Sequence, residues 1–213
     1  SQNELAEYNA YSLLDETERA RWLRFRSNRS RREFALCRAV LRSILCSRLG
    51  CENNRLSFEA SDHGKPFALV GCASVPVSFN VSHSGNHGLI AIASGSRLGV
   101  DVEVRVPRTD LGGLAQTVFG PGELAEFMMK EEQEKLRFFY ALWTLKEALI
   151  KALGTGFSLN PSSFEIPLAM RQGAGKAIFR FPMLPNVCWK LENLGNAEFA
   201  AAIAYELNPI GGA

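Results

Sequence analysis

The stretch from residue 98 to 106 constrains the fold most, because its pattern is that of a β-strand. Hydrophobic residues stand at every second position from Leu98 to Val106, and Gly99, Asp101 and Glu103 are among those between them. A period of two places the apolar side chains on one face of a strand and the others on the opposite face. A strand with one apolar face must pack against another layer, so we expect a sheet covered on one side.

Two helices are expected in the first 50 residues. Asp15 followed by Glu18 matches a capping box, which predicts a helix over 15–25. Apolar residues at helical spacing predict a second helix over 31–49, with Gly50 as its stop. The sequence also predicts strands at 79–81, 88–93, 177–181, 188–192 and 199–205, and helices within 123–153. Between these elements we expect a turn at 63–66, a loop at 82–86 and a linker at 107–121. Helices and strands are mixed without βαβ regularity, so the predicted class is α+β.

The order of these segments hints at an internal duplication. Each half contains a long helix followed by strands, and each includes a strand of small residues, at 89–93 and 201–205. A chain of 213 residues suits one domain or two small ones. We therefore expect two similar α+β lobes, an N-terminal lobe over 1–105 and a C-terminal lobe over 106–213.

Composition excludes several classes of protein. Apolar residues make up 46% of the chain and charged residues 22%, which excludes a largely disordered protein. The charge-free stretch 66–82 is interrupted by Pro76, so we expect no membrane span, and the polar residues 1–11 do not resemble a signal peptide. The five cysteines are an odd number without metal-site spacing, which predicts reduced thiols and a cytoplasmic location.

Positive charge is concentrated near the N-terminus. Between Arg19 and Arg48 there are ten arginines and one acid, Glu33, so this segment carries +9 and the rest of the chain −7. Such a cluster predicts an anionic partner or a solvated face. Arginine suits forked contacts to phosphate, so a nucleic-acid-binding module is one candidate. That reading leaves the carboxylates at Asp101, Glu103 and Glu147 unexplained.

Asp101 and Glu103 are candidate metal ligands. They stand two apart on the predicted strand, so both carboxylates project from one face. Adjacent carboxylates repel each other unless a cation or protons lie between them. Carboxylate oxygens are ligands that Mg²⁺ prefers. The alternative is an ordinary solvent-facing edge strand.

The helix that contains Trp143 offers a second candidate. Trp143, Glu147 and Lys151 are four apart and share one face, and Lys146 adds to a charged patch near the helix end. The alternative is a surface Glu–Lys pair worth a few tenths of a kcal/mol.

A third candidate is the segment Ser82-His83-Ser84-Gly85, which follows an apolar strand. Hydroxyls, an imidazole and backbone amides could converge there on an anion. The alternative is a hydrogen-bonded structural histidine. His83 and His87 have no third nitrogen or sulfur ligand at suitable spacing, so we do not expect a zinc site.

These segments closely resemble, in order and spacing, the three motifs of the 4′-phosphopantetheinyl transferases. The motifs are Phe-Asn-Val-Ser-His-Ser at 79–84, Gly-Val-Asp-Val-Glu at 99–103 and Trp-Thr-Leu-Lys-Glu-Ala-Leu-Ile-Lys at 143–151. The resemblance is closer to the surfactin-synthetase-activating type, a monomer of two pseudo-symmetric lobes with the active site at their interface, and runs from about residue 14 to 205.

The resemblance implies transfer of the phosphopantetheine arm of coenzyme A to a serine of an apo acyl, polyketide or peptidyl carrier protein. The other product is adenosine 3′,5′-bisphosphate, the required ion is Mg²⁺ or Mn²⁺, and the setting is fatty-acid or secondary-metabolite biosynthesis. A degenerate relative that binds coenzyme A without transfer is an alternative, which the intact carboxylates and Lys151 argue against.

The resemblance also implies roles for single residues. Asp101, Glu103 and Glu147 match the Mg²⁺-binding carboxylates. Glu147 also matches the proposed general base, and Lys151 the lysine at the leaving phosphate. The segment 111–135 is a candidate carrier contact, with a solvated linker as the alternative. The residues that match coenzyme A contacts are Arg26, Arg29, Arg42, His63, Gly64, Lys65, Pro66, Ser82, His83 and Lys151.

Overall fold

A computed structural model describes residues 2–154 and 159–207. The chain forms two compact units, one of residues up to 61 with 66–77 and the other of 62–65 with the residues from 78 onward. The division near residue 77 differs from the expected boundary near 105. The difference arises because the strand at 77–84 is bonded to the strand at 98–104. Backbone amides of the later strand donate hydrogen bonds to side chains of the earlier one, so both belong to the second unit.

The first unit combines helices with a small antiparallel sheet of order β1-β2-β3. The capping box at Asp15 and Glu18 is confirmed, with both of its hydrogen bonds formed. The next helix begins earlier than predicted because Ser27 caps it, and it ends as predicted at Gly50, which has a left-handed backbone. The elements are α1 (Gln2–Ser12), α2 (Glu16–Arg24), α3 (Asn28–Leu49), η1 (Asn53–Arg55), β1 (Leu56–Ala60), β2 (Pro66–Val70) and β3 (Ala73–Ser74).

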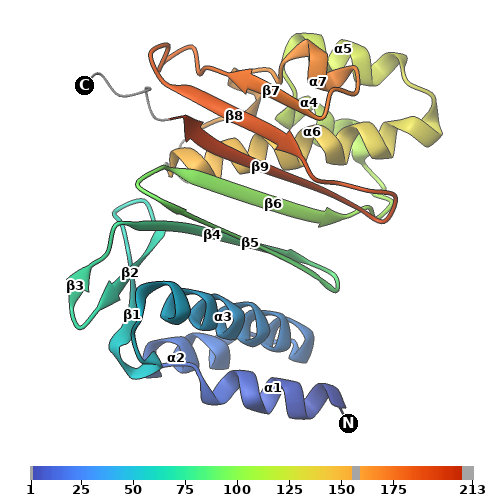
Figure 1. Ribbon diagram of the computed structural model, residues 1–213. Helices are drawn as coiled ribbons and strands as arrows, with labels where there is room; N and C mark the ends of the chain where they lie inside the picture. The colour runs from blue at the N-terminus through green and yellow to red at the C-terminus, as the bar shows by residue number, and fades with distance from the viewer. Residues whose placement is uncertain (1, 155–158, 208–213) are drawn as a thin grey trace. The chain divides into compact units, whose positions relative to one another are not determined.

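The second unit is built on an antiparallel sheet of order β6-β9-β8-β7, with helix α6 across one face (Figure 1). Strands β4 and β5 form a separate hairpin. The elements are β4 (Val77–Ser84), β5 (His87–Ser94), β6 (Leu98–Val104), α4 (Leu111–Val118), α5 (Pro121–Met129), α6 (Glu132–Leu153), η3 (Pro161–Ser163), α7 (Leu168–Arg171), β7 (Lys176–Phe179), β8 (Cys188–Asn193) and β9 (Phe199–Leu207). Helices and antiparallel strands in this mixture confirm the α+β class.

Two segments expected to be irregular are partly regular. The predicted loop 82–86 is shorter, since β4 runs on to Ser84 and the chain turns at Gly85, whose φ is 61°. The predicted linker 107–121 contains α4, which starts where the Asp110 side chain accepts a hydrogen bond from Gly113 N at 2.8 Å.

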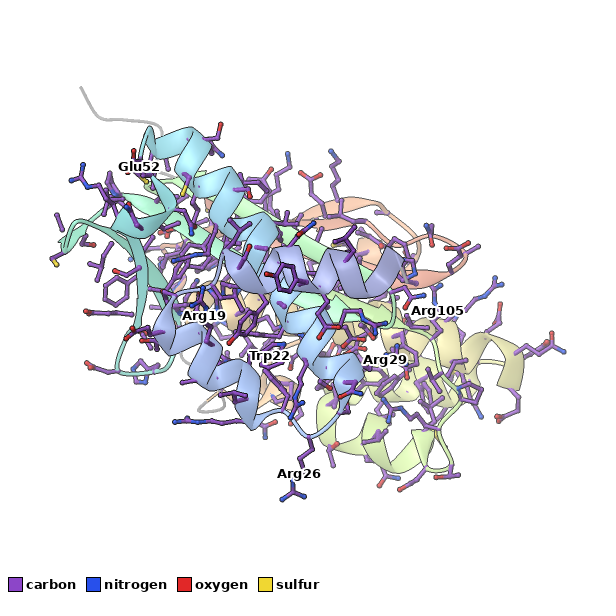
Figure 2. The ribbon with its side chains drawn as sticks, turned by 90° about the horizontal axis from the view of Figure 1, so that it is seen from below. Arg19, Trp22, Arg26, Arg29, Glu52 and Arg105 are labelled. Carbon is purple, nitrogen blue, oxygen red and sulfur yellow. The ribbon has the colours of Figure 1, made fainter. Side chains whose placement is uncertain are left out.

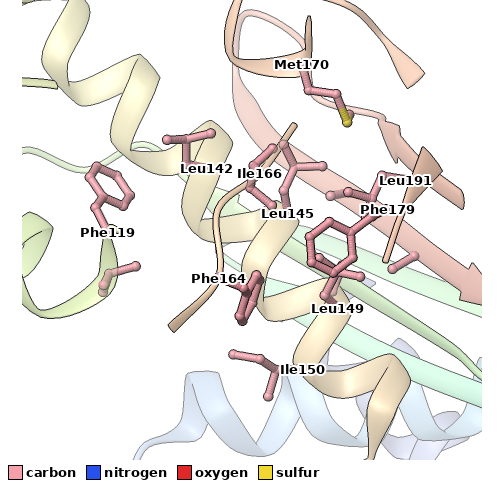
Figure 3. Close-up of a cluster of buried hydrophobic side chains, with 14 of the residues drawn as sticks. Phe119, Leu142, Leu145, Leu149, Ile150, Phe164, Ile166, Met170, Phe179 and Leu191 are labelled. Atoms are coloured by element: carbon pink, nitrogen blue, oxygen red, sulfur yellow. The ribbon is translucent and has the colours of Figure 1, made fainter. Parts of the chain in front are cut away.

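Packing of α6 against β6 decides where the site lies. A Cβ at Gly99 would overlap Ala148 O and Ala152 N, so only glycine lets the helix approach this closely. Leucines of α6, among them Leu145 and Leu149, enter a buried cluster with Phe164 and Phe179 (Figure 3). Each fully buried leucine of this kind contributes about 1.5–3 kcal/mol. The first five residues of β6, which alternate between its two faces, are all buried. Although β6 is at the edge of its sheet, it is therefore not the solvent-facing strand of the alternative.

No helix in the described ranges, 2–154 and 159–207, is long and apolar enough to cross a membrane.

Candidate active site

The three sequence motifs meet in one pocket of the second unit. Its volume is about 290 Å³, and β4, β6 and α6 supply its lining. The helical spacing of Trp143, Glu147 and Lys151 places all three at this pocket, as expected for residues on one helix face. The lining residues are Val81, Ser82, His83, Asp101, Glu103, Trp143, Glu147 and Lys151.

Asp101 is the most enclosed of the acidic groups, with 3% of its surface exposed. Its Oδ1 atom accepts hydrogen bonds from Lys151 Nζ at 2.7 Å and from Ser82 Oγ at 2.8 Å. Burial raises the pKa of the Asp101 carboxyl above its usual range, while Lys151 and Ser82 oppose the rise. Its Oδ2 atom has no hydrogen-bond partner in the described part of the chain. A buried carboxylate oxygen without a partner is costly, so this atom suits a cation.

Glu147 lies in an environment that disfavours its negative charge. Burial is the main cause of the rise in the pKa of the Glu147 carboxyl, and the nearby charges of Asp101 and Glu103 add to it. Lys151, one helical turn further on, acts in the opposite direction. A carboxylate with a raised pKa accepts a proton more readily, which is what a general base requires.

Polar side chains of β4 line the free edge of β6. Three alternate residues of β4 accept hydrogen bonds from alternate amides of β6, as a neighbouring strand would. Ser84 Oγ also donates to Glu103 Oε2 at 2.7 Å, so one hydroxyl joins the strand edge to a candidate metal ligand. The three bonds are Val100 N to Asn80 Oδ1 at 2.9 Å, Val102 N to Ser82 Oγ at 3.3 Å and Val104 N to Ser84 Oγ at 3.1 Å.

Sequence reasoning missed the roles of Asn80 and Ser84. Their spacing with Ser82 was the available clue, because a polar residue at every second position of an apolar strand faces one side.

The carboxylates fit a divalent cation, although within the described residues no three potential ligands are already clustered around one point. Asp101 offers the unpartnered Oδ2, and Glu103 and Glu147 line the same pocket. The Lys151 ammonium lies against Asp101 and offsets its charge. The donor set is all oxygen, as Mg²⁺ prefers.

The residues matched to coenzyme A contacts are distributed over both units. In the turn between β1 and β2, His63 and Gly64 are exposed, whereas the Lys65 ammonium donates to backbone carbonyls. Pro66, at the start of β2, belongs to the first unit. Ser82 and His83 lie in the pocket.

The arginines matched to phosphate contacts lie in the first unit and differ in exposure. Arg26 projects away from the turn between α2 and α3 (Figure 2). Arg29 is exposed and pairs with Glu33 at 2.7 Å. Arg42 is 1% exposed, and its guanidinium donates to Leu13 O, Leu56 O and the Asp15 carboxylate. These bonds give Arg42 a structural role within the first unit, and its phosphate contact stays a prediction.

The charged patch expected around Lys146 is not formed, because the Lys146 side chain is fully buried. Its ammonium pairs with Glu123 at 2.8 Å and donates to Pro161 O and Phe164 O. In the sequence, Lys146 is grouped with the charged residues of the helix because it is next to Glu147. Consecutive helical residues face different directions, so the two side chains lie in different surroundings.

Comparisons with known proteins agree with the motifs. Residues 97–204 match the family model of the 4′-phosphopantetheinyl transferase superfamily, and residues 2–95 match that of the 4′-phosphopantetheinyl transferase N-terminal region.

Three relatives illustrate the similarity. A Synechocystis protein is 36% identical over 147 residues, which is 69% of this chain and 59% of that protein. The 4′-phosphopantetheinyl transferase HetI of a Nostoc species is 37% identical over 147 residues, 69% of this chain and 62% of the relative. The 4′-phosphopantetheinyl transferase ffp of Bacillus subtilis is 30% identical over 158 residues, 74% of this chain and 67% of the relative. The match to the first two thus spans about three fifths of their length.

Proposed function

Because this chain belongs to the 4′-phosphopantetheinyl transferase superfamily, we propose that it transfers 4′-phosphopantetheine from coenzyme A to a serine of an apo carrier protein. The observation that carries the proposal is the convergence of Asp101, Glu147 and Lys151 in one pocket. A lysine against one buried carboxylate and a second carboxylate of raised pKa match the needs of phosphoryl transfer.

In the proposed reaction, the carrier serine oxygen forms a bond to the phosphorus that bears the pantetheine arm. The bond from that phosphorus to the bridging pyrophosphate oxygen breaks, and adenosine 3′,5′-bisphosphate leaves. A serine hydroxyl is poorly ionised near neutral pH, so Glu147 takes its proton, directly or through water. Lys151 offsets the charge that develops on the leaving phosphate.

Asp101, Glu103 and Glu147 would hold Mg²⁺, or Mn²⁺, which supplies neutralisation of pyrophosphate charge. Ser82 and His83 are proposed phosphate contacts at the same pocket, with Arg26 and Arg29 as contacts from the first unit. His63, Gly64 and Pro66 are proposed to line the adenine side.

The proposed carrier contact is the segment 111–135, which forms α4, α5 and the start of α6. Two methionines at the end of α5, Met128 and Met129, are 63% and 87% exposed. Exposed methionines form adaptable apolar contacts with a partner protein. They therefore favour a carrier contact at this segment over the alternative, a solvated linker. We also expect a monomer that acts in the cytoplasm, which gel filtration with light scattering and cell fractionation would check.

The arginine-rich segment no longer favours a nucleic-acid partner. Arg38 pairs with Glu18 at 3.1 Å while its guanidinium lies over Phe58, and Arg42 is buried. These two arginines of the segment thus stabilise the first unit and are not presented to an anionic partner.

The test is intact-mass spectrometry of an apo carrier protein incubated with this protein, coenzyme A and Mg²⁺. We expect the carrier to gain one phosphopantetheine mass, and the gain to disappear with chelator or with Asp101→Ala. Glu198→Gln, which changes an exposed acid outside the pocket, is the matched control and should remain active. Coenzyme A binding without transfer to several unrelated carriers would favour the degenerate relative, and failure to bind coenzyme A would refute the proposal.

A further inference from the structure

The side chain of Lys65 connects two elements of the active site. Its Nζ atom donates hydrogen bonds to Lys151 O at 2.9 Å, Ala152 O at 3.1 Å and Leu98 O at 2.9 Å. The first two carbonyls belong to the last turn of α6, and the third begins β6. An ammonium group has three N–H donors, so each of these three carbonyls of the described residues can receive one of them. Residues 62–65 belong to the second unit, so the interaction lies within one compact body.

The end of α6 is suited to receive this ammonium. The last carbonyls of a helix lack partners within the helix and carry partial negative charge. The helix ends at Gly154, whose φ is 78°, and a Cβ there would lie 3.1 Å from Lys65 Cδ. A glycine at this point therefore leaves room for the lysine stem. Burial lowers the pKa of the Lys65 ammonium to about 8, with the charge of Arg97 adding to the effect. A half-buried cation is stabilised by such acceptors.

The two elements that Lys65 joins carry the charged groups at the centre of the pocket. Lys151 accepts a bond from Lys65 at its carbonyl and reaches Asp101 with its side chain at 2.7 Å. Asp101 stands three residues after Leu98 on β6. A shift between the end of α6 and the start of β6 would change the distance between Lys151 and Asp101.

We propose that Lys65 is a positioning residue, whose ammonium holds the end of α6 against β6 and so fixes Lys151 relative to Asp101. The inference rests on the proposed transfer reaction. It differs from the phosphate contact that the family resemblance implies for Lys65, because the ammonium already serves three backbone carbonyls.

The kinetic test compares Lys65→Met, which keeps the stem without the charge, with Lys65→Arg and with the exposed control Lys176→Met. We expect Lys65→Met to lower kcat about tenfold or more, because small displacements of catalytic groups are costly. The KM for coenzyme A should stay within about threefold, since the phosphate contacts remain. Lys65→Arg should recover part of kcat, and Lys176→Met should match the wild type. A rise of about tenfold in KM with kcat unchanged, or no change in either, would overturn the proposal.

A second measurement uses the unmodified protein, in case Lys65→Met fails to fold. In ¹⁵N-lysine-labelled protein, the Lys65 ammonium should give a slowly exchanging NMR signal, assigned by its absence in Lys65→Arg. Saturating coenzyme A should shift the Lys151 signal and leave the Lys65 signal in place. A comparable shift of Lys65 would show a ligand contact and refute the positioning role. Absence of transfer by the wild type, or of any shift on adding coenzyme A, would instead count against the proposed function.

Discussion

Replacement of Lys146 by methionine tests whether the buried ion pair with Glu123 holds the second unit together. Both side chains have an exposure of 0% and lie 2.8 Å apart. Glu123 also accepts hydrogen bonds from Gly120 N at 2.9 Å and Ile166 N at 2.7 Å. The pair therefore joins the start of α5, the middle of α6 and the segment that follows η3.

The expected loss follows from what Lys146→Met leaves behind. The Glu123 carboxylate stays buried without its cation, and the carbonyls of Pro161 and Phe164 lose a donor. Removing one partner of a buried pair costs about 3–5 kcal/mol. Because the free energy of unfolding of a single domain is about 5–15 kcal/mol, this loss is a large share of the total stability.

The assay is urea unfolding followed by tryptophan fluorescence. A Trp22→Phe background removes the tryptophan of the first unit and leaves Trp143 and Trp189 to report on the second. Lys176→Met is the control, since the Lys176 side chain is 64% exposed and its pair with Glu192 is worth at most about 1 kcal/mol.

A double variant separates the pair from simple loss of packing. Combining Lys146→Met with Glu123→Gln removes the uncompensated charge. The free energy of unfolding lost by the double variant should therefore be about 1–3 kcal/mol smaller than the sum of the two single-variant losses. A loss below about 1 kcal/mol for Lys146→Met, or strict additivity in the cycle, would refute the reasoning.

Three further predictions concern the site, the packing and the acid response. Ser84→Ala should weaken Mn²⁺ binding about tenfold by calorimetry, because a charge-assisted hydrogen bond to Glu103 worth about 1.5–3 kcal/mol is lost; unchanged affinity would contradict this. Gly99→Ala should cost about 3 kcal/mol in urea unfolding because α6 must move away from β6. Gly112→Ala, where a Cβ meets open space within α4, should instead add about 0.5–1 kcal/mol. Hydrogen bonds from Lys176 and Tyr205 lower the pKa of Glu192 from 4.5 to about 2. The ionised Glu192 carboxylate therefore stabilises the folded state fully above pH 4.5, and this contribution is lost as pH falls toward 2. The urea midpoints of wild type and Glu192→Gln should converge in acid.

Controls make these outcomes specific. Equal losses for Gly99→Ala and Gly112→Ala would mean that helix–strand contact at residue 99 is not limiting. A Glu192→Gln difference that stays constant between neutral pH and acid would show that the carboxylate charge is not the cause.

Local patterns in the sequence determined the elements that depend on neighbouring residues. The capping box at Asp15 and Glu18, the stop at Gly50 and the alternation from Leu98 were readable because caps and periodicity act within one or two turns. The spacing of the helical motif at Glu147 and Lys151 placed both on one face for the same reason, and the α+β class followed from the mixture of elements.

Tertiary structure decided which charged groups are buried and what they bind. Lys146, Lys65 and Arg42 are all basic residues, yet each is at least partly buried and bonds to partners from 14 to 87 positions away. Sequence spacing does not reveal such partners, because they meet only when segments that are distant in the chain pack together. Tertiary packing also buries Asp101 and brings Ser82 and Ser84 of β4 to its strand, so it converts two alternate carboxylates into a site.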